Sequence, residues 1–475
     1  MALHKLVNNK MKKYRLKITR NDFNELKRIV LADMPEEAGA FALAGVAEYG
    51  DQIDVLVRRP IALPKQMMVV QNEYHLEVAP QAINGLVSLC ESNGLGAVIC
   101  HSHPGGLHYS SSDDYGEARI ANTLRQFISA NAPIASLLFT PDEVTGRIWL
   151  NGNPYAVPLD EIIIVGPTVQ RIETKMGRST KPQSLDLYDR QVRAFGFEGQ
   201  ESISRVRVGV VGVGGTGSPV AEQLARLGVS DFVLVDPDKF STTNLTRVYG
   251  TFSVSTKKLK LGTEYKVNLI ASHLKKINPK IQVKAINQSV VLSEVAPKLL
   301  DRDILFLCTD EHWGRSIVNQ IAYQYLIPAI NLGVRITSDE GKISHAIGVI
   351  DILHPDKACL WCKQFLRSET IRAESMSPHE RRNLQRDGYV EDVDTPTPSV
   401  ISFTSSVSSQ AVSLFIHMFT NFMGESGDIG RLSYDFLTGE TRRGTTQVDK
   451  NCVCRKVKSF GNLKPLPTVK KLTHK

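Results

Sequence analysis

Two histidines and an aspartate form the first group of residues that could carry out chemistry. His101 and His103 end the apolar run GAVICHSH, and Asp114 follows in the stretch SSSDD. Residues i and i+2 of a strand point to the same side, so both imidazoles can face one ion. Two nitrogens and one carboxylate leave a fourth tetrahedral position for water, as in catalytic zinc sites. The alternative is a surface histidine pair beside an ordinary helix cap.

The full string HSHPGGLHYSSSDD favours the metal site, because it resembles the signature of JAMM (JAB, MPN) metallopeptidases. The resemblance implies that His101, His103 and Asp114, rather than Asp113, are the zinc ligands. It also implies that the Ser111 hydroxyl steadies the oxygen of the tetrahedral intermediate. A serine stands where this family often has a proline, just before that hydroxyl.

The segment PEEAGAFALAG resembles the region that supplies the catalytic glutamate of this family. Its register favours Glu37, with Glu36 as the alternative. Zinc lowers the pKa of its bound water, and a carboxylate base completes the activation of that water. Read without the resemblance, both glutamates could equally belong to a solvated helix end.

A glycine-rich turn forms a second candidate site. It lies between a strand and a helix in VGVVGVGGTGSPVAEQLARLG, where a backbone without side chains can approach a phosphate at a helix N-terminus. Asp236 follows 19 residues after Gly217, at the end of the next strand, where a carboxylate can hold ribose hydroxyls. Taken alone, this pattern is also typical of an NAD site. The glycines concerned are Gly212, Gly214, Gly215 and Gly217.

Polar and basic residues after this turn favour a triphosphate over NAD. Asn244 and Arg247 come soon after the second strand, and Lys266 follows, with Lys260 as an alternative. Asp310 ends the buried strand DILFLCTD, where a carboxylate can hold Mg²⁺ against phosphates. An ordinary helix N-cap is the other interpretation of Asp310.

Four strings in order resemble the ThiF/MoeB-type adenylating domain that is shared with ubiquitin-activating enzymes: LYDRQVRAFGFEGQ, VGVGGTGS, VDPDKFSTTNLTR and CTDEHWGR. The resemblance covers roughly residues 185–450. It implies ATP as the nucleotide, with Asp236 on the ribose and Asp310 on Mg²⁺. It also implies that Arg190 reaches the γ-phosphate across a homodimer interface. The residues implied to contact the phosphates are Asn244, Arg247 and Lys266.

Seven cysteines divide into two kinds. Cys90, Cys100 and Cys308 lie in apolar stretches and are expected in the core. Two close pairs resemble the structural zinc site of the same adenylating family, although the second pair is spaced more tightly than usual. No cysteine lies between Lys363 and Asn451, where ubiquitin activators carry the thioester cysteine. The adenylate is therefore expected to pass directly to a thiol, persulfide or amine of a partner, unless a paired cysteine is the nucleophile. The pairs are Cys359 with Cys362 and Cys452 with Cys454.

The elements that must position these residues fall into two α/β units. The first mixes strands such as 14–19 with helices near 21–34, capped by Asn21, and near 81–93 and 114–130. The second alternates strands with helices, including 264–276 and 293–300, which predicts a parallel, doubly wound Rossmann-like sheet. The expected divisions are a JAMM-type domain at 1–165, a linker at 166–184, a ThiF-type domain at 185–455 and a basic tail at 456–475.

Composition fits a cytoplasmic globular protein. The net charge is +8, and no apolar run of 18 residues predicts a membrane span. Lysines and arginines gather near both ends, which are expected to be solvated. The basic tail has Phe460 as its single aromatic residue, so neither nucleic acid nor membrane is an expected partner.

Together the two sites predict action on a ubiquitin-like protein ending in glycine. One unit would adenylate the terminal carboxylate, and the other would trim a precursor or remove conjugates. A conjugating protein is a candidate further partner. Alternatives are activation of a sulfur-carrier protein, an NAD-dependent oxidoreductase with an incidental histidine pair, and a non-catalytic scaffold.

Overall fold

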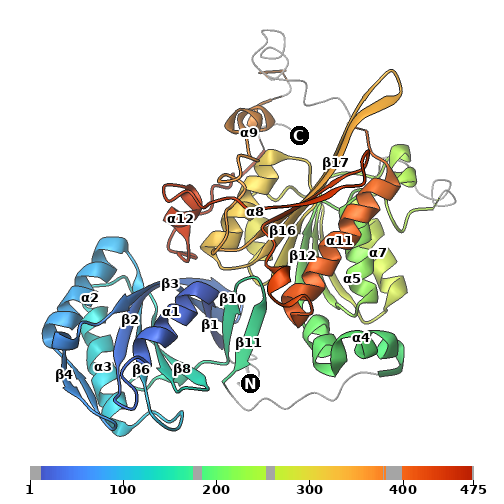
Figure 1. Ribbon diagram of the computed structural model, residues 1–475. Coiled ribbons are helices and arrows are strands. Elements are labelled where there is room, and N and C mark those ends of the chain that lie inside the picture. The colour runs from blue at the N-terminus through green and yellow to red at the C-terminus, as the bar shows by residue number, and fades with distance from the viewer. Residues whose placement is uncertain (1–11, 175–184, 253–262, 378, 381–397, 473–475) are drawn as a thin grey trace, which may run out of the picture.

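The computed structural model describes residues 12–174, 185–252, 263–377, 379–380 and 398–472. Two α/β lobes lie side by side, and the C-terminal segment around α12 (Val453–Val457) lies between them (Figure 1). In the described part of the chain, no helix is long and apolar enough to cross a membrane.

The N-terminal lobe is a nine-stranded sheet covered by helices on both faces. Strand β2 alternates its side chains between two cores, so that Ala40 packs with Phe23 and Leu26 of α1, while Phe41 packs beneath α2 and α3. The strand order is β11-β10-β1-β3-β2-β6-β7-β8-β9. The strands are β1 (Lys13–Thr19), β2 (Gly39–Tyr49), β3 (Gln52–Ala62), β6 (Gly96–Ser102), β7 (Ile134–Phe139), β8 (Val144–Trp149), β9 (Val157–Pro158), β10 (Glu161–Val165) and β11 (Val169–Glu173). The helices are α1 (Arg20–Val30), α2 (Pro80–Asn93) and α3 (Ser111–Arg125), and a small hairpin pairs β4 (Met68–Gln71) with β5 (Leu76–Val78).

The C-terminal lobe is an eight-stranded sheet in the order β14-β13-β12-β15-β16-β17-β18-β19. Helices α5, α7 and α11 pack on one face, and α8 packs on the other. The doubly wound Rossmann-like arrangement is confirmed. The sheet is parallel from β14 to β16 but antiparallel from β16 to β19, so the expectation of a parallel sheet holds for the nucleotide-binding half alone. The strands are β12 (Arg207–Val211), β13 (Asp231–Val235), β14 (Gln282–Ile286), β15 (Ile304–Leu307), β16 (Ala329–Asp339), β17 (Lys342–Leu353), β18 (Arg431–Asp435) and β19 (Thr441–Gly444). The helices are α4 (Leu185–Ser204), α5 (Gly217–Arg226), α7 (Lys266–Ile277), α8 (His312–Gln324), α9 (Ser368–Ser375) and α11 (Ile401–Thr420).

Two local expectations need correction. The first helix begins at Arg20, and the Thr19 hydroxyl, not Asn21, caps it by accepting from the Asp22 amide. The segment expected as a helix at 293–300 forms only a short 3₁₀ turn over Ala296–Leu299.

The predicted linker begins too early. Strand β11 lies inside 166–184 and pairs antiparallel with β10, so residues up to Glu173 belong to the N-terminal sheet. Residues 175–184 lie outside the described part. Polar composition suggested a linker, but β11 is an edge strand, where polar side chains remain hydrated.

The expectation of a solvated basic tail at 456–475 is wrong for its described residues. The buried Ser459 hydroxyl donates to the Val57 carbonyl of the N-terminal lobe (2.8 Å). The Gly461 amide donates to the Gln324 carbonyl of the C-terminal lobe (2.9 Å). The segment therefore holds both lobes, and one of its basic side chains, Lys458, is itself buried in an ion pair with Asp22 of the N-terminal lobe.

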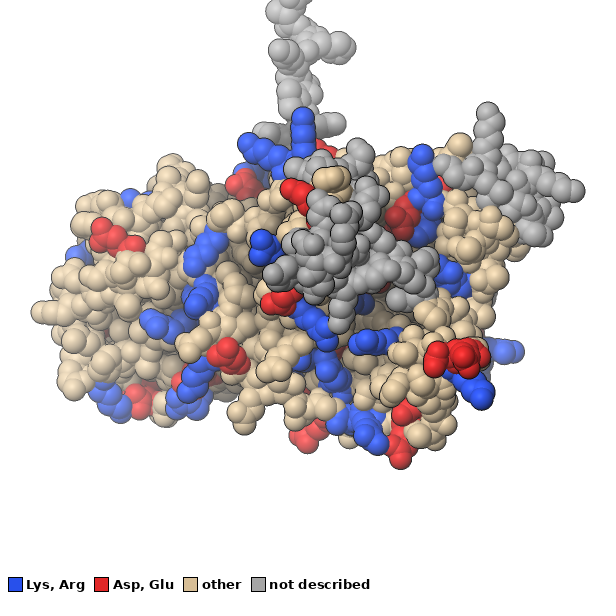
Figure 2. All heavy atoms as spheres, turned by 90° about the horizontal axis from the view of Figure 1, so that it is seen from above, with Lys and Arg blue, Asp and Glu red and all other residues tan. Residues whose placement is uncertain are grey.

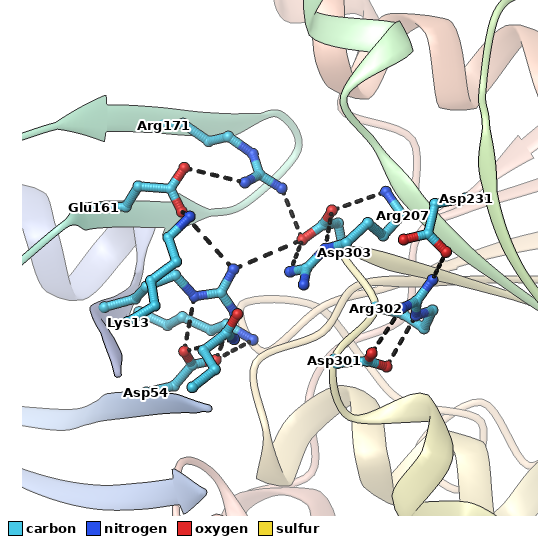
Figure 3. A network of polar contacts seen from close by, with 12 residues as sticks. Lys13, Asp54, Glu161, Arg171, Arg207, Asp231, Asp301, Arg302 and Asp303 are labelled. Atoms are coloured by element: carbon cyan, nitrogen blue, oxygen red, sulfur yellow. Dashed lines mark hydrogen bonds and ion pairs between the residues drawn. The ribbon is translucent and has the colours of Figure 1, made fainter. Parts of the chain in front are cut away.

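The basic N-terminal run is not fully solvated either. Arg15 is buried, and its Nε lies 2.8 Å from Asp54 Oδ1. Arg15 Nη1 also lies 3.9 Å from Asp303 Oδ1 across the lobe boundary. Figure 3 shows Asp303 between Arg171, 2.7 Å away, and Arg207, 2.9 Å away. On the face shown in Figure 2, acidic and basic side chains are interspersed. The lobes are thus joined by paired charges as well as by the tail.

Candidate functional site

The end of β6 and the first turn of α3 build the N-terminal site. His101 Nε2 lies 3.5 Å from Asp113 Oδ1, and His103 Nε2 lies 3.4 Å from Asp113 Oδ2. One ligand atom from each of these three residues lies within 4.8 Å of the others. The buried Nε2 of His101 has no hydrogen-bond partner. A metal ion fits this donor set, because it would satisfy that nitrogen and use the carboxylate.

The structure corrects the predicted aspartate. Asp114 points away from the histidines, pairs with Arg147, and has a side chain that is 61% exposed. The reason is helical register: Ser110 caps α3, and Asp113, at the third position, turns back to accept from the Ser110 amide (2.6 Å). The next residue points about 100° further around the helix. The helical register also bears on the hydroxyl predicted to steady the intermediate. The side chain of Ser111 is exposed, and it is the Ser110 hydroxyl that contacts Asp113 (2.8 Å).

Glu37 lies beside the histidines, whereas Glu36 is exposed. The Glu37 Oε1 is 3.4 Å from His103 Nε2, and the Glu37 amide donates to the Asn72 carbonyl in the loop between β4 and β5 (2.9 Å). Burial raises the pKa of Glu37. Of the two glutamates left open by the sequence, Glu37 is the one placed to take a proton at this site.

Glu117 and Arg147 are site residues that the sequence analysis missed. The buried carboxylate of Glu117 lies 3.7 Å from His101 Nδ1 and accepts from Arg147 Nε (2.8 Å). A carboxylate behind a metal-binding histidine fixes its ring orientation and tautomer. The available signal was spacing, since Glu117 is four residues after Asp113 and therefore on the same helix face.

A cavity of about 210 Å³ opens at the carboxyl ends of the parallel strands in the C-terminal lobe. Gly212 has φ +86°, and a Cβ there would lie 2.6 Å from the Thr309 amide nitrogen. A Cβ on Gly217 would lie 1.9 Å from the Gly212 carbonyl oxygen, so Gly217 allows the glycine-rich turn to pack closely against the start of α5. Gly217 does not line the cavity. The residues expected at the nucleotide that do line it are Gly212, Gly214, Gly215, Asp236, Asn244, Arg247, Lys266 and Asp310.

Backbone contacts and an ion pair fix the polar side chains of this cavity. The buried Asp236 accepts from the amides of Val213 (2.8 Å) and Asp238 (2.9 Å) at the end of β13, and burial raises its pKa. Lys266 Nζ lies 2.8 Å from Asp238 Oδ2. Asn244 is buried and accepts from the Ser241 amide. Carboxylate, amide and ammonium groups thus meet where a nucleotide's ribose and phosphates would lie.

Two expected nucleotide ligands are not placed in the cavity. Arg190 is exposed on α4 and is absent from the cavity lining of this single chain. Lys260 lies outside the described residues. Lining residues that the sequence analysis missed include Thr309, Arg315 and Thr404. Arg315 closes the CTDEHWGR string, so proximity in sequence to Asp310 was the usable signal.

The two cysteine pairs meet although they are far apart in sequence. The Sγ atoms of Cys359 and Cys452 are 3.5 Å apart, and those of Cys362 and Cys454 are 3.8 Å apart. Cys452 precedes the short helix α12, which turns Cys454 back toward the pair despite the tight spacing. Hydrogen bonds from the neighbouring thiols lower the pKa of Cys359 to about 5. Four converging thiols fit a closed, tetrahedral Zn²⁺ site.

Of the remaining cysteines, Cys90 and Cys100 are buried, whereas Cys308 is half-buried and lines the nucleotide cavity. Burial raises the pKa of Cys90 and of Cys308 to about 12, and raises that of Cys100 further. A thiol is nucleophilic as its thiolate, so these three are poor acyl acceptors.

The fold and the cavity define the class of the C-terminal lobe: it is a Rossmann-like domain with a phosphate-binding turn and a ring of polar side chains suited to a nucleotide. Residues 188–455, more than half of the chain, match the model of the ThiF family, and the chain belongs to this family.

Three curated relatives illustrate the similarity. The molybdopterin-synthase adenylyltransferase of Escherichia coli (strain K12) is 30% identical over 153 residues, which cover 31% of this chain and 58% of the relative. The ubiquitin-like modifier-activating enzyme 5 of Drosophila grimshawi is 28% identical over 288 residues (57% and 64%). The SAMP-activating enzyme E1 of Haloferax volcanii is 29% identical over 191 residues (39% and 64%). The chain thus spans less than two thirds of the length of each.

Among solved structures, the chain is similar to E. coli MccB with ATP, with a TM-score of 0.45 and 18% identity over 57% of this chain and 74% of that one. This similarity is too low to add to the family assignment.

Proposed function

We propose that the C-terminal lobe uses ATP and Mg²⁺ to adenylate the terminal carboxylate of a ubiquitin-like or sulfur-carrier protein. The observation that carries the proposal is one cavity lined by the glycine-rich turn, a buried ribose-type carboxylate, three basic side chains and Asp310. The names of the relatives, two activating enzymes and one adenylyltransferase, point in the same direction.

The residues divide the work of the reaction. Asp236 would orient the ribose, and Asn244, Arg247 and Lys266 would hold the phosphates. A carboxylate oxygen of the protein substrate attacks the α-phosphorus, the bond to the bridging oxygen of the β-phosphate breaks, and pyrophosphate leaves. Mg²⁺ bound by Asp310 would neutralise the leaving group.

The acyl adenylate is then proposed to pass directly to a partner's nucleophile. Three of the seven cysteines have thiols whose pKa is raised by burial, and the other four form the proposed zinc cluster. Each transfer would release AMP: attack by a thiol would make a thioester, and attack by an amine would make a conjugate. Attack by a persulfide would make an acyl disulfide, from which a second thiol would free the thiocarboxylate as a new disulfide forms. Mass spectrometry of the carrier after incubation with ATP distinguishes these products. Arg190 is proposed to complete the site from the second subunit of a homodimer.

The decisive test is exchange of labelled pyrophosphate into ATP that depends on a glycine-terminated protein. Asp310→Ala should abolish exchange, whereas His103→Ala, which changes the other lobe, should not. An NAD-dependent oxidoreductase would give no exchange in any mixture, and a scaffold would give none either.

For the N-terminal lobe we propose a JAMM-type zinc peptidase or isopeptidase acting on the same partner. The proposal rests on the cluster of His101, His103 and Asp113 with Glu37 beside it. Zinc bound by the first three would supply a water of lowered pKa, and Glu37 would take its proton. The lobe would trim a precursor to expose the carboxylate or remove finished conjugates.

Adjacent aspartates provide a matched test of this site. Asp113→Asn should lose zinc, measured by elemental analysis, together with cleavage of a carrier extended beyond its terminal glycine. Asp114→Asn should retain both, because its side chain faces Arg147 and solvent. Equal zinc content in the two variants would contradict the assignment of Asp113.

A further inference from the structure

Arg315 is a buried cation without a partner in the nucleotide cavity. It lies in the second turn of α8, is 8% exposed, and lines the cavity. Its Nε is buried with no hydrogen-bond partner, and no ion pair among the described residues involves its guanidinium group. Within the described part of the chain, its guanidinium lies over the face of Phe365, whose ring centroid is 5.0 Å from the Arg315 Cζ.

Three acidic side chains lie close enough to Arg315 to raise its pKa: Asp310, Asp351 and Glu374. Asp310 is the proposed Mg²⁺ ligand, and the other two are already engaged. Asp351 lies 2.9 Å from Lys363 Nζ and 2.8 Å from Arg431 Nε. Glu374 accepts from the amides at the start of α8. Burial lowers the pKa of Arg315, but an arginine remains charged at neutral pH. A buried charge without an ion-pair partner costs several kcal/mol, and Asp310 would be shared with Mg²⁺, which indicates that an anion completes this site.

The position of Arg315 indicates which anion. In the order β13-β12-β15-β16, Asp236 follows β13, the glycine-rich turn follows β12 and Asp310 follows β15. Arg315 lies one strand further, because its Nη2 is 3.2 Å from where a Cβ of Gly333 on β16 would lie. A nucleotide whose ribose is at Asp236 and whose phosphates reach Asp310 leaves this end of the cavity to the acyl group.

We propose that Arg315 binds the terminal carboxylate of the incoming protein substrate. The inference rests on the adenylation function proposed above. The guanidinium fork matches the two carboxylate oxygens. One oxygen then forms the bond to the α-phosphorus as pyrophosphate departs, while the other, which becomes the carbonyl oxygen of the acyl adenylate, keeps its hydrogen bond to Arg315. No proton is transferred in this step.

The test compares Arg315→Met and Arg315→Lys with the wild-type protein, and uses Arg372→Met, an exposed arginine on α9, as the control. Three measurements are made on the full chain: the unfolding temperature without ligand, the Kd of ATP-Mg²⁺ by calorimetry, and pyrophosphate exchange with a glycine-terminated carrier. Arg315→Met should unfold at the wild-type temperature or above and bind ATP-Mg²⁺ with an unchanged Kd. Its exchange should fall ~10–100-fold, the loss expected for a charge-assisted hydrogen bond. Arg315→Lys should retain part of the exchange activity, with a KM for the carrier that is higher than that of the wild type.

Each other result counts against the inference. A lower unfolding temperature of Arg315→Met would assign the residue a structural role. A tenfold weaker Kd for ATP-Mg²⁺ would make it a phosphate ligand instead. Unchanged exchange in Arg315→Met beside an active wild type would remove the residue from catalysis. Failure of the adenylation proposal looks different, since the wild type itself would then show no carrier-dependent exchange.

Discussion

Asp303 offers a quantitative test of how the two lobes are joined. Its side chain, 4% exposed, lies 2.7 Å from Arg171 and 2.9 Å from Arg207, and Arg15 lies 3.9 Å away (Figure 3). Two of these arginines belong to the N-terminal lobe and one to the C-terminal lobe. Replacing Asp303 by Asn would leave all three without this carboxylate. Removing one partner of a buried ion pair costs about 3–5 kcal/mol. Arg171 and Arg207 are about one-quarter exposed, which places the expected loss near ~3 kcal/mol.

The neighbouring Asp301 provides the matched control. It pairs with Arg302, but its own side chain is 41% exposed, so Asp301→Asn should cost at most ~1 kcal/mol. Urea unfolding at pH 7, followed by tryptophan fluorescence, measures both losses, because Trp149 reports on the N-terminal lobe and Trp313 and Trp361 on the other. Asp303→Asn should lower the urea concentration at which the tryptophan fluorescence of both lobes changes.

The pH dependence gives a second measurement of the same group. The surrounding arginines hold the pKa of Asp303 well below its ordinary value of 3.8. Its stabilisation is therefore complete above pH 3.8 and is lost as the pH falls through the lower folded-state pKa. Asp303→Asn should remove this part of the acid sensitivity. The reasoning would be refuted if Asp303→Asn and Asp301→Asn lowered the free energy of unfolding by amounts that agree within 1 kcal/mol. The charges at the lobe boundary would then be solvated.

Three further predictions concern single residues. Glu117→Gln should weaken zinc binding ~10–100-fold by freeing the His101 ring, which competition with a chelating dye measures; an unchanged affinity would deny Glu117 its orienting role. Gly45→Ala should detach the tail, because a Cβ at Gly45 would lie 2.1 Å from the Ser459 carbonyl oxygen. Tryptic cleavage near residue 458 should then accelerate, whereas Gly85→Ala, where nothing lies within 4 Å, should leave the cleavage rate unchanged. Burial lowers the pKa of His354 to about 3 from its ordinary 6.5, so folding should lose up to ~1.4 kcal/mol for each pH unit below 6.5; His354→Leu should flatten this slope in unfolding titrations, and an unaltered slope would show that His354 is not its source.

The places of both candidate sites could be predicted from the sequence because each depends on short strings. Strand-end histidines two residues apart, and glycines between a strand and a helix, fix local geometry without reference to distant residues. The aspartate beside the histidines shows the limit of this reasoning. Asp113 and Asp114 are chemically identical, and the choice depends on where α3 begins. The Ser110 cap sets that start, and three consecutive serines offer no means of choosing it from sequence.

Residues that act through distant partners were beyond sequence reasoning. Arg15 is one of several basic residues near the N-terminus, and its burial depends on Asp54, in another strand, and Asp303, in the other lobe. Arg315 looks like a surface arginine of an amphipathic helix until β16 is placed over it. For both Arg15 and Arg315, the charge of the side chain suggested an exposed position, whereas residues distant in sequence bury it in the folded chain.

The composition of the chain predicted two separate domains and a free tail, whereas in the structure the tail contacts both lobes. Cys452 and Cys454 hold the start of the tail against the C-terminal lobe, and a few residues later Asn462 donates to Val46 of the N-terminal sheet (2.6 Å). Metal binding by the four cysteines would therefore also fix the point from which the tail reaches the other lobe. A cut in the predicted linker would leave the tail contacts and the Asp303 charge network intact. The two candidate sites therefore lie on lobes that are joined both by the tail and by the Asp303 charge network.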